Sequence, residues 1–233
     1  MWNGKLKALT FSYDDGITQD KRLIEIFNKY GLKATFNLNS EKLGEPWELE
    51  VLGAKVSHNK VMPEEVKELY KGHEVAVHTL KHPNLTTIED DAEVIRQVEE
   101  DRKNLERLTG GEVIGMAYPC GGVNNDDRVA KIIKENTGVQ YSRTITSTGS
   151  FDLQDNLYRF NPTVFHVNFD EMVQLGKKFL ELNPDKPQLY YIWGHSYELD
   201  AMDNWKEFED FCKMMSGHDD IFYGTNREVL LNK

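Results

Sequence analysis

Short apolar runs alternate with amphipathic segments along almost the whole chain. Several runs are apolar at nearly every position, which is typical of parallel strands covered on both faces. We expect strands at 6–13, 33–39, 74–79, 113–118, 139–145, 163–167, 188–193 and 220–224. Between them, apolar residues recur at helical spacing. We expect helices at 18–30, 63–71, 88–108, 126–136, 169–182 and 204–215.

Repeated strand–helix units in a chain of 233 residues predict an α/β fold with a parallel sheet, either open or closed into a barrel. The length suits one domain over residues 1–233. Residues 40–62 show only weak periodicity, so we expect a long loop or an insertion over one end of the domain.

Polar clusters follow four of the predicted strands. They are Asp14-Asp15-Gly16, the pair His78 and His82, the turn Tyr118-Pro119-Cys120, and His195. In both kinds of parallel sheet the chemistry gathers at the carboxyl ends of the strands. Four such clusters, far apart in sequence, therefore predict one shared site.

A metal centre is the best interpretation of three of these residues. Asp15, His78 and His82 offer one carboxylate and two imidazoles, a set that suits zinc and also cobalt, nickel, manganese or iron. Three protein ligands leave positions open for water and substrate, as in catalytic sites. The alternative is that His78 is a hydrogen-bonded core residue and His82 a surface residue.

The remaining polar groups suit hydrolysis. Asp14 can accept a proton from a metal-activated water, or it can cap a turn or act as a second ligand. His195 can protonate a leaving group, or it can be a buried histidine bonded to a backbone carbonyl. The turn at Pro119 and Cys120 can aim a backbone N–H at an oxyanion, or simply end a strand.

The composition of the chain limits the kinds of binding partner that are expected. The net charge of -11 and the pI near 5.2 argue against a nucleic-acid surface and against attraction to anionic membranes. No apolar run reaches the ~18 residues of a membrane helix, so no membrane insertion is expected. Two cysteines make no disulfide framework, and the first residues lack a secretory signal. These features favour the cytoplasm, or secretion if a signal stood upstream.

Four segments together resemble the polysaccharide deacetylases (carbohydrate esterase family four, the NodB-homology domain). They are residues 10–16 (TFSYDDG), 78–82 (HTLKH), 117–121 (AYPCG) and 192–195 (IWGH). The resemblance implies a distorted (β/α) barrel of about seven parallel strands and metal-dependent removal of N-acetyl groups from amino sugars. It implies Asp14 as catalytic base, Asp15, His78 and His82 as metal ligands, the Cys120 N–H as oxyanion donor, His195 as general acid and Ile192 at the acetyl pocket.

The chain also departs from this family pattern. Ala117 replaces the arginine that pairs with the base, and Arg143 at the end of the next strand can take its place or be a surface residue. The fourth motif is unclear, since Asp152 and Asp155 lack the tryptophan that follows them in the family. Cys120 removes an aromatic ring from the site. As a nucleophile it would need a neighbouring cation or base, and none is adjacent in sequence.

A few further residues are candidates for a glycan groove. Glu198 can bond His195 or a sugar hydroxyl, or be a solvated loop acid. The candidate groove aromatics are Trp47, Tyr118, Trp193, Tyr197 and Trp205, of which Tyr118, Trp193 and Tyr197 are next to proposed site residues. No role is assigned to His58, His73, His166 or His218.

The predicted function is thus a metal-dependent hydrolase, with zinc favoured, that acts on an acetylated sugar by attack of a metal-activated water. N-acetyl groups are favoured over O-acetyl groups. The alternatives are a non-catalytic carbohydrate-binding domain stabilised by a metal, or an amidase of the same fold acting on a small non-sugar amide.

Overall fold

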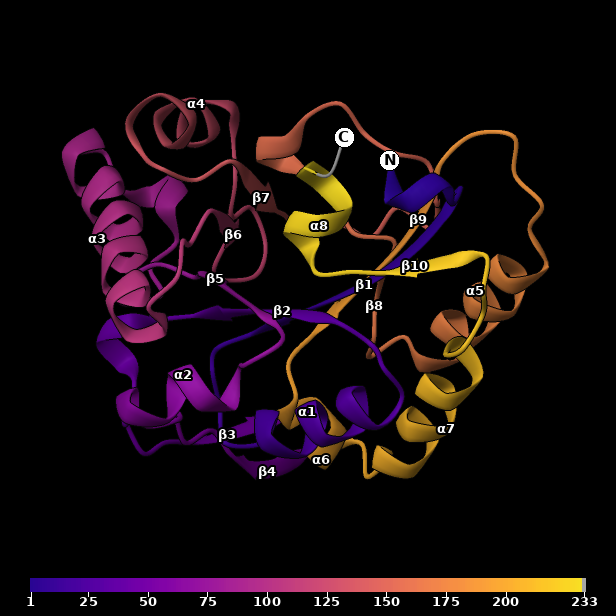
Figure 1. The fold of residues 1–233 in the computed structure, drawn as a ribbon. Coiled ribbons are helices and arrows are strands. Elements are labelled where there is room, and N and C mark those ends of the chain that lie inside the picture. The colour runs from indigo at the N-terminus through magenta and orange to yellow at the C-terminus, as the bar shows by residue number, and fades with distance from the viewer. Residues whose placement is uncertain (232–233) are drawn as a thin grey trace.

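A computed structural model describes residues 1–231. Seven parallel strands, in the order β7-β6-β5-β2-β1-β9-β8, curl into a distorted barrel (Figure 1), and a short eighth strand, β10, pairs with β1. The strands are β1 (Lys7–Asp14), β2 (Ala34–Leu38), β5 (Glu74–Val77), β6 (Gly115–Ala117), β7 (Tyr141–Arg143), β8 (Val164–Phe165), β9 (Gln188–Gly194) and β10 (Ile221–Tyr223). The predicted single-domain α/β fold is confirmed, and each of the eight predicted strands overlaps an observed one.

The barrel is distorted because β1 shares one edge between two partners and an irregular segment joins the outer strands. Residues 7–9 of β1 pair with β10 and residues 11–14 pair with β2. At the far edges, the Phe160 N–H donates to Ser142 O of β7 at 3.0 Å. The Thr163 N–H donates to Tyr191 O of β9 at 2.8 Å. The segment 160–163 therefore bridges β7 and β9 without forming a regular strand.

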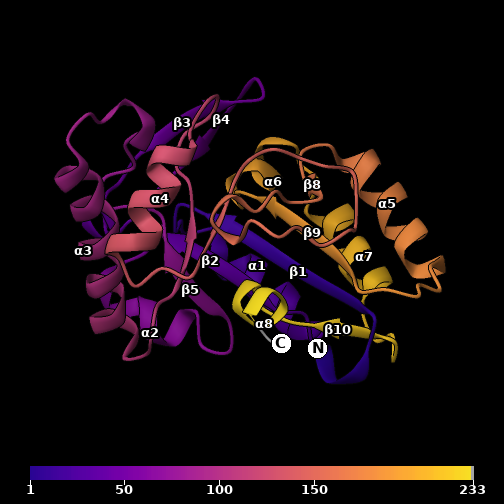
Figure 2. The ribbon, with the colours of Figure 1, turned by 90° about the horizontal axis from the view of Figure 1, so that it is seen from above.

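Helices cover the outside of the sheet. They are α1 (Asp20–Lys29), α2 (Val66–Leu69), α3 (Asp91–Thr109), α4 (Asp127–Asn136), α5 (Phe169–Glu181), α6 (Tyr197–Ala201), α7 (Trp205–Met215) and α8 (Asn226–Leu231). Helices α3 and α4 lie over β5 and β6, whereas α5 and α7 lie over β8 and β9 (Figure 2). The outward side chains of the strands, such as Phe11, Phe36 and Ile192, form the main apolar core beneath them. The pattern did not predict α6 or α8.

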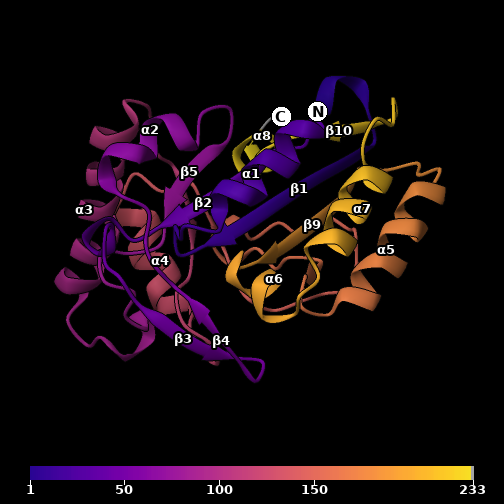
Figure 3. The same cartoon turned by 90° about the horizontal axis from the view of Figure 1, so that it is seen from below.

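The inside of the barrel combines polar side chains with a small apolar cluster that includes Ala8, Leu189 and Val229, and α8 closes it at one end. The Asn226 N–H donates to Thr35 Oγ1 at 2.8 Å, and the Arg227 N–H donates to Glu74 Oε2 at 2.9 Å. Figures 2 and 3 show α8 beside the two termini and the hairpin β3–β4 at the opposite end. The amino ends of the strands are thus plugged, and the carboxyl ends remain open for a site.

Residues 40–62, expected as a loop or insertion, contain an antiparallel hairpin that the pattern did not predict. It consists of β3 (Glu48–Val51) and β4 (Ala54–Ser57). Leu52 and Gly53 form its turn with φ of 53° and 77°, the left-handed conformation that two-residue hairpin turns favour. Among residues 1–231, no helix has the length and apolar character needed to cross a membrane.

Candidate active site

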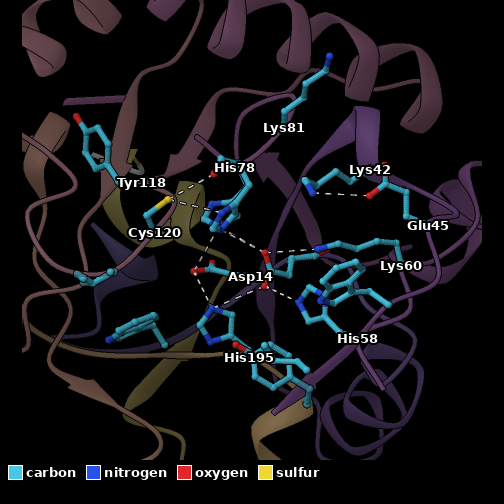
Figure 4. Close-up of a pocket in the computed structure, with 18 residues that line it drawn as sticks. Asp14, Lys42, Glu45, His58, Lys60, His78, Lys81, Tyr118, Cys120 and His195 are labelled. Carbon is cyan, nitrogen blue, oxygen red and sulfur yellow. Dashed lines mark hydrogen bonds and ion pairs between the residues drawn. The ribbon is translucent and has the colours of Figure 1, made fainter. Parts of the chain in front are cut away.

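A cavity of about 550 Å³ opens at the carboxyl ends of the strands (Figure 4). It brings together most of the residues that the sequence placed at strand ends, although Asp14 and His195 are 181 positions apart. Those lining it are Asp14, Asp15, His78, His82, Tyr118, Cys120, Trp193 and His195. The hairpin and its flanks form another part of the wall, with Trp47, Leu49, His58 and Lys60.

Asp15, His78 and His82 converge as the metal interpretation requires. One ligand atom from each lies within 4.8 Å of the other two. His78 Nε2 and His82 Nε2 lie 3.8 and 3.6 Å from Asp15 Oδ1. Asp14 Oδ2 is 4.0 Å from His78 Nε2, so Asp14 borders this group. The described residues form one such cluster.

The two histidines are in the right protonation state to bind a cation. His78 Nδ1 donates to Ala117 O at 2.8 Å, which leaves the Nε2 lone pair directed at the cluster. Burial lowers the pKa of His78, and burial together with the neighbouring His78 lowers the pKa of His82 to about 4. Two neutral imidazoles and one carboxylate are a fitting donor set for a divalent transition metal.

Backbone conformation explains how adjacent aspartates face one cavity. Asp15 has φ of 83° and Gly16 has φ of 60°, so the chain turns sharply as β1 ends. A Cβ at Gly16 would lie 2.6 Å from Leu38 Cδ2, so a larger residue would displace the Leu38 side chain as well as adopt an unfavourable positive φ. Thr79 and His82 also have positive φ, at 68° and 63°. Such conformations are costly for residues other than glycine and gather at functional sites.

Asp15 is held by two residues that follow the hairpin. Its Oδ2 is hydrogen-bonded to His58 Nε2 at 3.0 Å. Lys60 Nζ donates to Asp15 O at 2.7 Å and lies 3.5 Å from Oδ1. Burial opposes the charge on Asp15, but Lys60 and His58 hold the pKa of its carboxyl well below the usual range. Asp15 is therefore ionised and keeps Oδ1 for a cation. No role for His58 was predicted from the sequence.

Asp14 is fixed by a separate set of contacts. Arg143, which is fully buried, donates from Nη2 to both carboxylate oxygens and from Nε to Ser12 Oγ. Asn37 Nδ2 donates to Asp14 Oδ1 at 2.8 Å. The Arg143 guanidinium lies over the Trp193 ring, 4.6 Å from its centroid. Arg143 thus occupies the position behind Asp14 that the sequence considered for it.

His195 is oriented by a carboxylate that it shares with a second histidine. Its Nδ1 bonds Glu198 Oε1 at 3.0 Å, and its backbone N–H donates to Glu198 Oε2 at 2.8 Å. The same Oε2 is 2.7 Å from His166 Nε2, and His166 Nδ1 is 3.0 Å from the Tyr13 hydroxyl. His195 Nε2 faces the cavity, 4.0 Å from Asp14 Oδ2.

The negative charge of Glu198 determines the protonation state of His195. Burial disfavours the imidazolium, but the adjacent Glu198 carboxylate outweighs it and raises the pKa of His195. Burial likewise opposes ionisation of Glu198, yet the two histidines lower its pKa. His195 therefore presents a protonated Nε2 to the cavity. Glu198 bonds His195, as one of the three sequence interpretations expected, while His166 was missed.

Asp152 and Asp155, the weak candidates for a fourth motif, lie away from the cavity. Asp152 Oδ1 pairs with Lys186 Nζ at 2.7 Å and accepts a hydrogen bond from Gln188. The carboxylate that bonds His195 Nδ1 belongs to Glu198, in a helix that the pattern did not predict.

The predicted substrate pocket is only partly assembled as expected. Tyr118, Cys120 and Trp193 line the cavity around Pro119, but Ile192 is fully buried in the main core and Ile145 takes a place in the wall. Ile192 points outward because side chains alternate along β9, and Trp193 next to it points in. Trp205, a groove candidate in the sequence, is also buried.

Cys120 has the environment of an ordinary thiol. Its Sγ is 3.7 Å from His82 Nδ1 and donates to His82 O at 3.4 Å. Burial raises the pKa of the Cys120 thiol. A nucleophilic cysteine would need the opposite shift.

Comparison with known proteins identifies the family. The family model described as polysaccharide deacetylase matches residues 3–141, more than half of the chain. The chain therefore belongs to the polysaccharide deacetylase family, whose members are hydrolases that act on acetyl groups of carbohydrates and are generally metal-dependent. A search of curated protein sequences finds no match.

Solved structures share the fold. A mutant of the peptidoglycan deacetylase PdaC from Bacillus subtilis aligns with a TM-score of 0.56 and 15% identity, over 97% of this chain and 90% of its own. A family 4 carbohydrate esterase from Streptomyces lividans, solved with acetate, gives 0.57 and 14%, over 95% and 92%. A family 4 pseudoenzyme from Bacillus anthracis gives 0.55 and 20%, over 97% and 66%. The fold thus occurs both with and without activity.

Proposed function

We propose that this protein is a metal-dependent deacetylase that removes N-acetyl groups from an amino-sugar saccharide. The observation that carries the proposal is the placement of Asp14. It lies beside the cluster of Asp15, His78 and His82, yet its own oxygens are engaged by Arg143 and Asn37. A base next to a cation site, and distinct from its ligands, is what hydrolysis requires.

Asp15, His78 and His82 would hold the metal. A divalent ion bound there supplies a Lewis acid for the acetyl carbonyl and lowers the pKa of a bound water. Zinc suits one carboxylate and two imidazoles best, and cobalt, nickel, manganese or iron also accept this set.

Two residues that border the cluster, Asp14 and His195, carry out the proton transfers. As the oxygen of the attacking water forms its bond to the acetyl carbon, Asp14 accepts the proton that the water loses. Arg143 pairs with the Asp14 carboxylate and aims it into the cavity. When the carbon–nitrogen bond breaks, the proton on His195 Nε2 passes to the amine nitrogen, and Glu198 stabilises the imidazolium before transfer.

Oxyanion stabilisation is assigned to the turn after β6. The backbone N–H of Cys120 has no acceptor among residues 1–231, and Cys120 has φ of 70°. A donor held in a stiff turn behind Pro119 needs little reorganisation as charge develops on the acetyl oxygen.

The test is acetate release from defined saccharides. The metal-free protein is reconstituted with zinc and incubated with N-acetylglucosamine oligomers and, in parallel, with O-acetylated xylo-oligomers. We expect acetate and free amine from the first substrate, lost with a chelator and restored by zinc. No acetate from either substrate with the metal-loaded protein would favour the non-catalytic alternative.

Asp14→Asn is the matched variant for this test. We expect it to bind zinc as the wild type does. Its rate of acetate release should fall about 10²–10⁴-fold, the usual contribution of a general base. Full activity in Asp14→Asn would remove the base from the mechanism.

A further inference from the structure

We propose that Trp47 forms a second sugar-binding position at the mouth of the catalytic cavity, where a pyranose ring linked to the acetylated sugar stacks on the indole. The inference rests on the proposed function, since it assumes a saccharide substrate. It also narrows the substrate class to saccharides of two or more units.

The first observation is the exposure of Trp47. The described chain has seven large hydrophobic side chains that are exposed, and Trp47, at 64%, is the one that also lines the catalytic cavity. Trp2, Trp193 and Trp205 are all at most 6% exposed. Scattered exposed apolar residues are common, but a tryptophan at the edge of a polar cavity points to a ligand.

The second observation is a second hollow that Trp47 also lines. A shallow depression of about 410 Å³ is lined by Pro46, Trp47, Glu48 and Asn59. Trp47 is the one residue that it shares with the catalytic cavity. A chain of sugars that leaves the cavity towards this depression therefore passes the indole.

The hairpin holds Trp47 in a fixed relation to Asp15. The His58 N–H donates to Trp47 O at 2.8 Å, and the Trp47 N–H donates to Asn59 Oδ1 at 2.9 Å. His58 in turn bonds Asp15 through its side chain. His58 therefore links the backbone of Trp47 to Asp15, a proposed metal ligand.

Packing beneath the hairpin keeps it in place. Val56 lies in a small apolar cluster with Ile17 and Tyr197, and Leu49 packs against it. The His58 and Tyr197 rings meet edge to face with centroids 5.2 Å apart. A platform that is ordered before the substrate arrives costs little entropy on binding.

The chemistry of the wall suits a pyranose. One face of a pyranose ring carries C–H groups, which pack on a flat aromatic ring as other apolar surfaces do. Lys42 and Glu45, which pair at 3.7 Å, line the cavity close to the hairpin and offer a donor and an acceptor to sugar hydroxyls. Figure 4 shows both on the same side of the cavity as Lys60 and His58.

Binding is tested first, without turnover. The Asp14→Asn protein is titrated with N-acetylglucosamine and its trimer, and the accessibility of tryptophan to acrylamide is followed by fluorescence quenching. Because the other tryptophans are buried, Trp47 dominates quenching. We expect the trimer to protect the fluorescence and the monomer not to. Addition of Trp47→Phe to Asp14→Asn should remove the protected component.

Kinetics supply the second arm. For Trp47→Ala we expect the ratio of kcat/KM for the trimer to that for the monomer to fall about tenfold, a typical loss when a ring stacked on an aromatic side chain loses its partner. Trp47→Tyr should restore most of the ratio. Leu52→Ala, exposed at the turn of the same hairpin and outside the cavity, is the control and should leave the ratio unchanged.

The outcomes separate this inference from the proposed function. An unchanged ratio in Trp47→Ala, or trimer binding to Asp14→Asn without protection of tryptophan, overturns the role of Trp47 while deacetylation stands. If the wild type releases no acetate from any saccharide, the proposed function fails, and the protection measured in Asp14→Asn still decides whether Trp47 binds sugar.

Discussion

The two sides of the cavity use histidine in opposite protonation states. On the metal side, burial lowers the pKa of His78 and His82, so both present lone pairs. On the donor side, Glu198 raises the pKa of His195, so it presents a proton. His195 Nε2 and His78 Nε2 are each 4.0 Å from Asp14 Oδ2.

The difference arises from what stands behind each ring. His78 Nδ1 donates to the neutral carbonyl of Ala117, which fixes the tautomer without adding charge. His195 Nδ1 faces the buried carboxylate of Glu198, which is also bonded to His166. The partner of the remote nitrogen thus decides whether the near nitrogen serves as a ligand or an acid. When their surroundings shift the pKa values of two titratable groups in opposite directions, the shifts indicate which group acts as acid and which as base or ligand.

The largest effect is expected from the metal side. His82→Ala should abolish stoichiometric zinc binding and lower the rate about a thousandfold or more, because the Lewis acid supplies several kcal/mol and each 1.4 kcal/mol is a factor of ten. Metal content after dialysis and acetate release measure the two effects. The control is His218→Ala, since His218 lies outside the cavity. Full zinc stoichiometry in His82→Ala would show that His82 is not a metal ligand and would contradict the account of the metal side.

The loss of rate on removal of the proton donor, His195, should depend on the leaving group of the substrate. In His195→Ala we expect the rate on an N-acetyl saccharide to fall about 10²–10⁴-fold, the range for general acid catalysis. An aryl acetate should lose far less, because a phenolate leaves without a proton. Zinc content should stay at that of the wild type. Equal losses on both substrates would mean that His195 does not act as the acid.

A smaller loss of rate is expected when Glu198, the residue that orients His195, is changed. Glu198→Gln keeps the size of the side chain but removes the charge that stabilises protonated His195, so the rate on the N-acetyl saccharide should fall about 10–100-fold, as for other groups that orient a functional histidine. Glu198→Asp should recover part of it, and KM should change little. If Glu198→Gln alters KM and leaves kcat intact, Glu198 contacts substrate rather than positioning His195.

The smallest effect should come from the partner of Asp15. His58→Ala removes one hydrogen bond to Asp15 Oδ2 while Lys60 remains, so we expect zinc affinity to fall about tenfold. At saturating zinc the activity should largely return. Competition with a chromophoric chelator measures the affinity. An unchanged zinc dissociation constant would show that His58 belongs only to the hairpin.

Much of the fold followed from local pattern, because buried parallel strands are apolar at almost every position. The hairpin did not, since its turn places Leu52 where asparagine or glycine usually marks a left-handed residue. Helix α6 has five residues, too few for a helical period to be seen. The irregular segment 160–163 closes the barrel through hydrogen bonds that no sequence period records.

The site divides in a similar way. Asp14, Asp15, His78 and His82 were predictable because strand ends meet at one edge of a parallel sheet. Arg143 was a candidate on the same argument. His58 and His166 were missed because their partners, Asp15 and Glu198, are 43 and 32 positions away and belong to other elements. The spacing of Glu198, three residues after His195 in the first turn of α6, was the one local signal for the donor side.

The central claim is that one divalent ion is held by Asp15, His78 and His82 while Asp14 stays uncoordinated. The most direct measurement is anomalous diffraction at the zinc absorption edge from crystals soaked in zinc. We expect a single strong peak about 2.0–2.1 Å from the Nε2 atoms of His78 and His82 and bonded to Asp15. A peak that includes Asp14 among its ligands, or no peak at these three residues, would contradict the account.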